Sequence, residues 1–240
     1  MNVQASPIRP GTLVLIPVPL AEDALHTLPA QVINKATGIK YYFVENIRTA
    51  RRLLKAMDLQ VDIDAIRFSE IRKTEPPDLD LLRQWLTAGE EVGLMSEAGC
   101  PAVADPGSIL VDAARQLDAR IIPMAGPNAM LMALMASGFN GQCFRFSGYP
   151  PIKEPARSKA LKALEQRVQG LDETQIFMET PYRNNQLLTD LIRVCSKTTR
   201  LCIAANITAP HEDIQTRTLA GWEREPGDFH KVPAVFLLGK

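Results

Sequence analysis

The chain lacks the motifs of the commonest nucleotide-binding and metal-binding proteins. Its 240 residues contain no Gly-x-Gly-x-x-Gly fingerprint and no Gly-Lys-Ser/Thr phosphate loop. The four cysteines (Cys100, Cys143, Cys195 and Cys202) form no Cys-x-x-Cys pair, and with only three histidines they make no zinc pattern. We therefore expect reduced, mostly buried thiols, no metal ion and a different class of ligand.

The chain also lacks net charge and long apolar runs. Its 27 basic residues balance 27 acidic ones, which argues against strong non-specific affinity for nucleic acid. Basic residues gather at helical spacing in 48–55 and 153–162, a pattern typical of solvated helix faces. No stretch approaches the roughly 18 apolar residues of a membrane span, and Met1–Gln4 has no signal-peptide character. We expect a cytoplasmic location and no membrane contact.

Short apolar runs alternate with amphipathic segments along the whole chain. The runs predict strands at 13–16, 41–44, 92–95, 119–123, 143–147, 176–178, 201–205 and 234–238. The amphipathic or apolar segments predict helices at 51–57, 81–88, 109–117, 129–136, 158–168 and 184–194. This alternation predicts an α/β protein with mostly parallel sheets and helices on both faces. The boundary near Pro123–Gly126 divides it into expected domains 1–123 and 124–240.

The segment 93–107 is the strongest candidate for a ligand loop. A strand ends at Met95, small residues around Gly99 follow, and Asp105-Pro106 is expected to open a helix. This arrangement brings backbone N–H groups close to a ligand. Gly126-Pro127 and Thr180-Pro181 repeat the same expected helix start, a cap residue before proline. We expect the three helix starts to line one crevice.

Five segments, in order, resemble the tetrapyrrole (corrin/porphyrin) methylase superfamily, and within it the ribosomal RNA small subunit methyltransferase I enzymes. The matching segments are Gly11-Thr12-Leu13 with Pro19, Glu45-Asn46-Ile47-Arg48 with 51–54, Ser96–Gly107, Gly126-Pro127-Asn128-Ala129, and Glu179-Thr180-Pro181-Tyr182-Arg183. The family has His where this chain has Tyr182. Their shared order and spacing indicate a resemblance that covers most of the chain.

The resemblance implies two α/β domains with S-adenosylmethionine bound in a cleft between them. Carried over by position, the expected cofactor-binding residues are Pro19, Glu97, Ala98, Gly99, Asp105, Gly126, Glu179, Thr180, Pro233 and Ala234. Glu45 and Arg48 are the expected catalytic residues, through acceptor contact or proton handling. The resemblance also implies a homodimer, no metal, and ribosomal RNA or the small ribosomal subunit as partner.

The chain departs from the family at the expected acceptor end. Asn46 stands in place of a family carboxylate, and 204–209 loses three family charges, with Asn206 and Ala209 at charged family positions. Two alternatives to an rRNA ribose 2′-O-methyltransferase therefore stay open. One is a methylase of a small, tetrapyrrole-type molecule, and the other is a non-catalytic S-adenosylmethionine-binding or RNA-associated protein.

Overall fold

The computed structural model describes residues 10–72 and 74–240. The chain divides into two compact units, Met1–Pro127 and Asn128–Lys240, so this division falls four residues beyond the expected boundary. The segment Met1–Gln4, on which the signal-peptide expectation rests, lies outside the described residues. Within the described ranges, no helix is long and apolar enough to cross a membrane.

The first unit is built on a five-stranded, wholly parallel sheet. Its strands are β1 (Thr12–Leu15), β2 (Tyr41–Val44), β3 (Arg67–Glu70), β4 (Glu91–Met95) and β5 (Arg120–Pro123). They lie in the order β3-β2-β4-β1-β5, and each neighbouring pair is parallel. Because side chains alternate along a strand, Leu13 and Val14 enter different cores on the two faces. The parallel expectation is confirmed in this unit.

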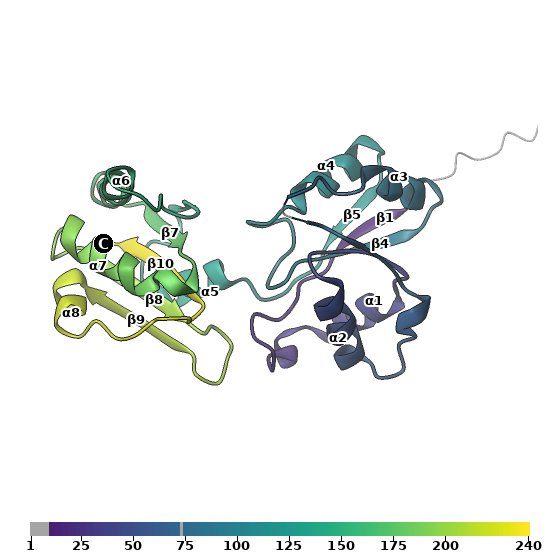
Figure 1. Cartoon of the computed structure of the whole chain (residues 1–240), viewed down its shortest axis with the longest axis horizontal. Helices are drawn as coiled ribbons and strands as arrows, with labels where there is room; N and C mark the ends of the chain where they lie inside the picture. Colours follow the sequence, from purple (N-terminus) through teal and green to yellow (C-terminus); the bar gives the residue numbers. More distant parts are fainter. Residues whose placement is uncertain (1–9, 73) are drawn as a thin grey trace, which may run out of the picture. The chain divides into compact units, whose positions relative to one another are not determined.

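Helices cover both faces of this first sheet, as Figure 1 shows. Those on one face are α1 (Ala30–Gly38) and α2 (Ile47–Met57), and those on the other are α3 (Leu79–Thr87) and α4 (Ser108–Gln116). Leu54 of α2 and Leu110 of α4 are fully buried in their respective cores. The short helices η1 (Leu25–Thr27) and η2 (Ile63–Ala65) lie in connecting segments.

The second unit contains a mixed sheet, which corrects the expectation of mostly parallel strands. Its strands are β6 (Phe144–Phe146), β7 (Thr174–Met178), β8 (Arg200–Ala205), β9 (Asp213–Thr218) and β10 (Ala234–Gly239), in the order β6-β7-β10-β8-β9. Only β6 and β7 are parallel, and the other three pairs are antiparallel. The sequence could not distinguish these cases, because β10 is a buried apolar run that suits either direction.

Four helices and one short helical turn complete the second unit. The helices are α5 (Ala129–Ser137), α6 (Ala156–Leu171), α7 (Asn184–Val194) and α8 (Leu219–Arg224), and the turn is η3 (Pro181–Arg183). Side chains of α6, α7 and α8 share one core with the sheet, in which Trp222 and Phe236 are buried. Helix α5 packs against β8, β9 and β10.

Candidate functional site

In the first unit, backbone hydrogen bonds connect the segments that follow the carboxyl ends of β1 and β4. Beyond these strands, Val18 and Gly99 pair through both backbone groups, with N···O distances of 2.9 and 3.1 Å. Gly99 has φ +75°, a conformation that side chains with a Cβ rarely adopt. This pairing brings the expected cofactor residue Pro19 beside the loop that carries Ala98 and Gly99.

The segment after β5 reaches the same edge. The Cys100 thiol lies 3.5 Å from the Pro127 carbonyl oxygen and 3.9 Å from that of Gly126. A Cβ on Gly126 would lie 2.3 Å from Pro17, so only glycine fits this close approach. Gly126 therefore joins Pro19 and Gly99 at one edge of the sheet, as expected for loops that follow parallel strands.

Glu45 connects the end of β2 to this same loop. Its half-buried carboxylate accepts a hydrogen bond from the Glu97 backbone N–H at 3.2 Å. The next residue, Asn46, caps α2 by accepting from the Thr49 N–H at 3.1 Å. Arg48, in the first turn of α2, is exposed. Glu45 thus contacts the expected cofactor loop, and Arg48 follows it on α2 in the same unit.

The expected role of Asp105 as a helix cap is wrong. Helix α4 begins at Ser108 with Gly107 as its cap residue, and no side chain caps it. The Asp105 carboxylate instead accepts from the backbone N–H groups of Ala102 and Gly107 at 2.7–2.9 Å. Burial raises the pKa of Asp105, and these hydrogen bonds oppose the shift. Asp105 therefore fixes the turn that leads into the helix.

The other two proline junctions also differ from expectation. Helix α5 is capped by Asn128, whose side chain accepts from the N–H groups of Met130 and Leu131. Thr180 precedes the short turn η3, and its side chain makes no capping hydrogen bond. The three junctions therefore share proline but not the same capping device, because the capping side chain lies two residues beyond the expected one (Asn128 in place of Gly126) or is missing.

The remaining expected cofactor residues meet at one edge of the second sheet. Val235 pairs with Met178 and Ala234 with Ala205, so Glu179 and Thr180 follow β7 where β10 begins. The Pro233 carbonyl accepts from the Asn206 N–H at 2.9 Å. Glu179, Thr180, Pro233 and Ala234 thus form one group in this unit, whereas the other expected residues form a group in the first unit. The cleft between domains stays a prediction.

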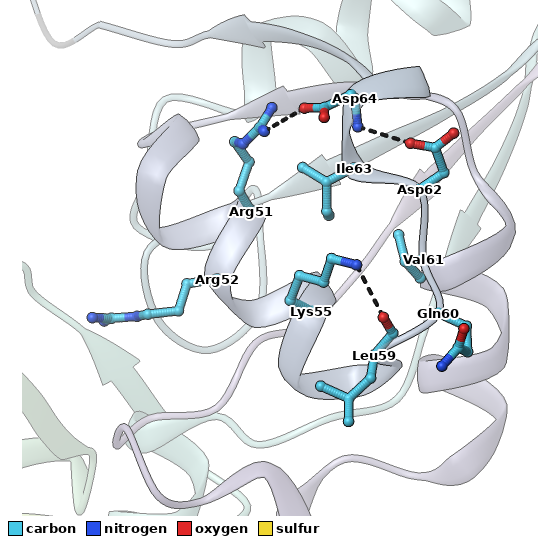
Figure 2. A pocket seen from close by; sticks show the side chains of 9 residues that line it. All are labelled: Arg51, Arg52, Lys55, Leu59, Gln60, Val61, Asp62, Ile63 and Asp64. Atoms are coloured by element: carbon cyan, nitrogen blue, oxygen red, sulfur yellow. Dashed lines mark hydrogen bonds and ion pairs between the residues drawn. The ribbon is translucent and has the colours of Figure 1, made fainter.

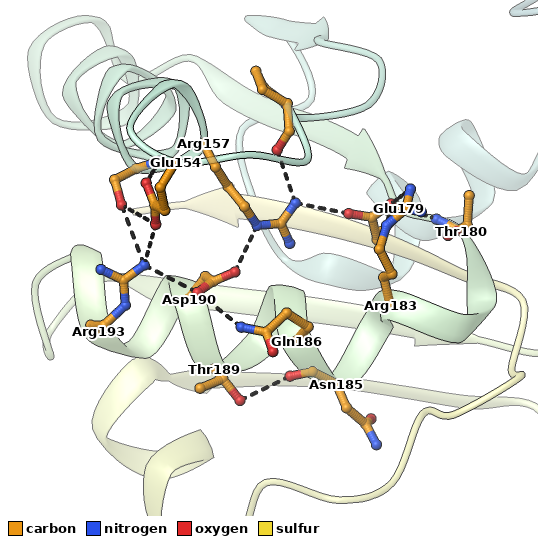
Figure 3. A network of polar contacts seen from close by, with 12 residues as sticks. Glu154, Arg157, Glu179, Thr180, Arg183, Asn185, Gln186, Thr189, Asp190 and Arg193 are labelled. Carbon is orange, nitrogen blue, oxygen red and sulfur yellow. Dashed lines mark hydrogen bonds and ion pairs between the residues drawn. The ribbon is translucent and has the colours of Figure 1, made fainter.

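A buried ion-pair network surrounds Glu179 (Figure 3). One carboxylate oxygen accepts from the Thr180 N–H at 2.8 Å and from Arg183 at 2.7 and 3.1 Å. The other oxygen accepts from Arg157 at 2.9 Å, and Arg157 also donates to Asp190 at 2.6 Å. Burial alone raises the pKa of Glu179, but the bonds from Arg183, Thr180 and Arg157 outweigh it, so the pKa is lowered.

A surface hollow of about 570 Å³ lies beside α2, as Figure 2 shows. Arg51, Arg52 and Lys55 line one wall, and the segment 59–64 lines the other. Arg51 pairs with Asp64 at 2.8 Å, and the Lys55 ammonium donates to the Leu59 carbonyl at 3.0 Å. The acidic residues across the hollow partly neutralise the basic run, which agrees with a solvated helix face.

Sequence reasoning missed two residues that the structure makes prominent. Arg157 belongs to a basic run that was expected to be solvated, yet its side chain is 4% exposed and holds Glu179. Thr208 has a buried hydroxyl without a hydrogen-bond partner, on a backbone with φ +69°. Neither residue has a signal in the neighbouring sequence. The partners of Arg157, for example, lie 22 and 33 residues further along the chain.

The residues present suit S-adenosylmethionine at both edges. In the second unit, the unsatisfied Thr208 hydroxyl lies two residues beyond Asn206, which bonds Pro233, and it can bond a polar adenosine group. In the first unit, the Gly99 loop exposes Glu97 and Ala98, which offer a carboxylate and backbone groups. Across the described residues, no group of three His, Cys, Asp or Glu side chains gathers as a metal site.

Comparison with known proteins assigns the chain to a class of methyltransferase. The family model of the tetrapyrrole (corrin/porphyrin) methylases matches residues 12–221, so the chain belongs to this family. The solved structure entitled "Crystal structure of the methyltransferase CobJ" shares the fold, with a TM-score of 0.62 and 19% identity. The similarity covers 95% of this chain and 93% of that one.

Curated relatives specify the branch of the family that the chain resembles. A protein of Vibrio cholerae named ribosomal RNA small subunit methyltransferase I is 29% identical, covering 94% of this chain and 76% of that protein. Proteins of the same name are 31% identical in Mesorhizobium japonicum, covering 91% and 70%, and 29% identical in Escherichia coli O157:H7, covering 95% and 77%. The chain is therefore a methyltransferase similar to these enzymes over most of its length.

Proposed function

We propose that this protein transfers a methyl group from S-adenosylmethionine to a ribose 2′-hydroxyl in RNA of the small ribosomal subunit. The observation that carries the proposal is that relatives named for this RNA match 88–96% of the chain. The grouping of Glu45, Glu97 and Gly99 at one sheet edge supports it.

The donor supplies a methyl group on a positively charged sulfur, and its leaving group is a neutral thioether. The ribose oxygen forms the new O–CH₃ bond while the S–CH₃ bond breaks, and the hydroxyl proton passes to a base. Alignment of the reacting atoms supplies most of the acceleration in such a displacement. The chain must therefore fix the donor and hold the hydroxyl in line with it.

The residues at the loop edge of the first sheet would divide these tasks. Backbone groups around Gly99 would hold polar groups of the donor, and Asp105 would keep its loop in shape. Glu45 is the candidate for accepting the hydroxyl proton, because its carboxylate already bonds the cofactor loop. Arg48, exposed one turn away on α2, would contact the anionic acceptor.

The acceptor end also motivates a narrower proposal about the target nucleotide. Asn206 uses its side chain for a 3.4 Å contact with the His211 carbonyl, and Ala209 offers only a methyl group. An amide and a methyl cannot replace the field of charged groups that hold and deprotonate a hydroxyl. We therefore propose weak turnover at the ribose that the family usually methylates and a stronger preference for another acceptor.

The experiment is transfer of labelled methyl from S-adenosylmethionine to three acceptors. These are small subunits purified from a strain lacking the family enzyme, free ribosomal RNA, and a cell lysate, each followed by mapping of the product. Label in RNA that falls at least tenfold in Glu45→Gln and Arg48→Ala supports the proposal. Arg83→Ala, an exposed arginine of α3, is the matched control.

Each contrary outcome contradicts a different part of the proposal: the acceptor, the activity or the roles of the two residues. Donor binding without label in any RNA excludes the RNA acceptor, and label in a small molecule of the lysate favours the tetrapyrrole-type alternative. Binding without any transfer favours a non-catalytic protein. Full turnover at the usual ribose, undiminished in both variants, contradicts the roles given to Glu45 and Arg48.

A further inference from the structure

An exposed cluster of an aromatic ring and cations lies beside the expected cofactor residues of the second unit. The side chain of Tyr182 is 69% exposed, and its ring lies 5.9 Å from the His230 ring at an interplanar angle of 74°. The Lys231 ammonium lies 5.8 Å from the centre of the Tyr182 ring. These contacts leave most of the ring open to solvent, an unusual position for a large aromatic side chain.

The backbone beneath the ring is tied in place. The Pro181 carbonyl accepts from the Lys231 N–H at 3.0 Å, which joins the turn η3 to the segment before β10. The buried Asn184 amide donates to the carbonyls of Phe229 and Val232 at 3.3 and 2.7 Å. Because this surface is already ordered, a ligand that binds it loses less conformational freedom.

Arg183, the residue after Tyr182, is a second cation, and its guanidinium is fixed by a carboxylate. Two of its nitrogens bond one oxygen of Glu179, whose other oxygen is held by the buried Arg157. Its side chain is 36% exposed, so part of the guanidinium faces solvent. Asp228 is the nearby acid, and its carboxylate accepts from the Asn185 amide and the His230 N–H. Its negative charge is thus engaged by these two donors.

We infer that Tyr182, Arg183 and Lys231 form a platform on which an unpaired RNA base stacks while its phosphate contacts the two cations. The inference rests on the proposed function and specifies how that function's acceptor is held. An exposed aromatic ring flanked by cations is how proteins bind single-stranded RNA.

The test measures binding of fluorescein-labelled single-stranded RNA of about 12 nucleotides by fluorescence anisotropy. An internal 2-aminopurine reports stacking directly. We expect Tyr182→Ala to weaken binding about tenfold or more and to remove the 2-aminopurine quenching, whereas Tyr182→Phe retains both. Lys231→Gln should lower the slope of log affinity against log salt by about 0.7.

Matched controls use similar side chains elsewhere in the same unit. Phe144→Ala removes an exposed aromatic ring beside Thr174, the residue at the opposite end of β7 from Tyr182. Lys159→Gln removes an exposed cation of α6. Neither should change affinity or quenching, and thermal unfolding midpoints should show that all variants are folded.

The outcomes separate the platform from the proposed function. Wild-type protein that methylates RNA and binds it as tightly as Tyr182→Ala overturns the platform and leaves the function standing. Wild-type protein with no affinity for RNA overturns both. Loss of self-association in Tyr182→Ala, with unchanged RNA affinity, assigns the surface to protein contact and also overturns the inference.

Discussion

Single residues at the loop edge of the first unit are constrained by backbone geometry as much as by side-chain chemistry. Gly99 has φ +75° and pairs with Val18, and a Cβ there would lie 3.3 Å from a Leu20 methyl group. The sequence identifies this glycine, because small residues between a strand and a helix are an obvious pattern. It cannot identify the role of Asp105, whose partners depend on how the turn closes.

We expect Gly99→Val to abolish binding of S-adenosylmethionine, because valine at this φ distorts the loop and its methyl groups press against Leu20. The strain should lower the free energy of unfolding by about 1–2 kcal/mol. Calorimetric titration measures the affinity, which we expect to be roughly micromolar in the wild type.

Gly89→Val is the matched control for this substitution. Gly89 has φ +83°, lies before β4 rather than after it, and has open space around its Cβ position. This variant should lose a similar amount of stability and keep its affinity for the donor. Equal donor affinity in Gly99→Val and the wild type would remove the loop from the site.

At the scale of elements, the sequence predicts the strands that are apolar and misses the polar ones. The apolar runs of β1, β2, β4 and β8 are found within one residue. The edge strands β3 and β9 are missed because Arg67–Glu70 and Asp213–Thr218 contain no apolar run. Helix α1 is also missed, and the short α8 follows β9 directly. Edge strands have one free side and need less apolar surface.

The network that joins α6, α7 and the end of β7 is an expected source of stability. Glu179→Gln removes a carboxylate from between Arg157 and Arg183 and leaves Arg157 with less compensation in a buried position. Breaking such a buried pair costs about 3–5 kcal/mol. Denaturant unfolding of the second unit near pH 7 should show this loss.

The pH dependence of this effect has a defined sign. The folded pKa of Glu179 is lowered, so its ionised form contributes stability above the unfolded pKa of about 4.3. This contribution is lost as the pH falls through the folded value, so the wild type and the variant should converge in acid. Glu223→Gln, at the half-exposed pair with Lys197, is the control and should cost about 1 kcal/mol or less. A constant difference between the wild type and Glu179→Gln at every pH would contradict the charge argument.

At the scale of the whole molecule, the sequence predicts the family and a two-part chain, whereas the direction of strands in the second part requires the structure. The segments that match the family lie mainly in loops that follow strands, and their residues can be read directly from the sequence. Strand direction in 174–239 depends on which connections cross the sheet, and apolar runs do not record it.

We expect a homodimer, with α5 as part of the contact. This helix is apolar on all sides, and Leu131 and Met135 are exposed although the helix packs on the sheet. Sedimentation equilibrium at micromolar concentration should give the mass of two chains for the wild type and of one chain for Leu131→Glu/Met135→Glu. Leu171→Glu, at the exposed end of α6, should stay dimeric. A wild-type mass of one chain would refute the expectation.

The position of β10 has a consequence for the order in which the protein is made. The first sheet has all five strands once residue 123 has been synthesised, whereas the middle strand of the second sheet comes from residues 234–239. Until then β7 and β8 have no partner between them, and their apolar edges are open to other chains. Nascent domains fold as units from the amino end. The first unit can therefore be complete while the second still lacks its central strand, β10. The interval before residues 234–239 have been synthesised is therefore when the chain is most exposed to wrong strand pairing.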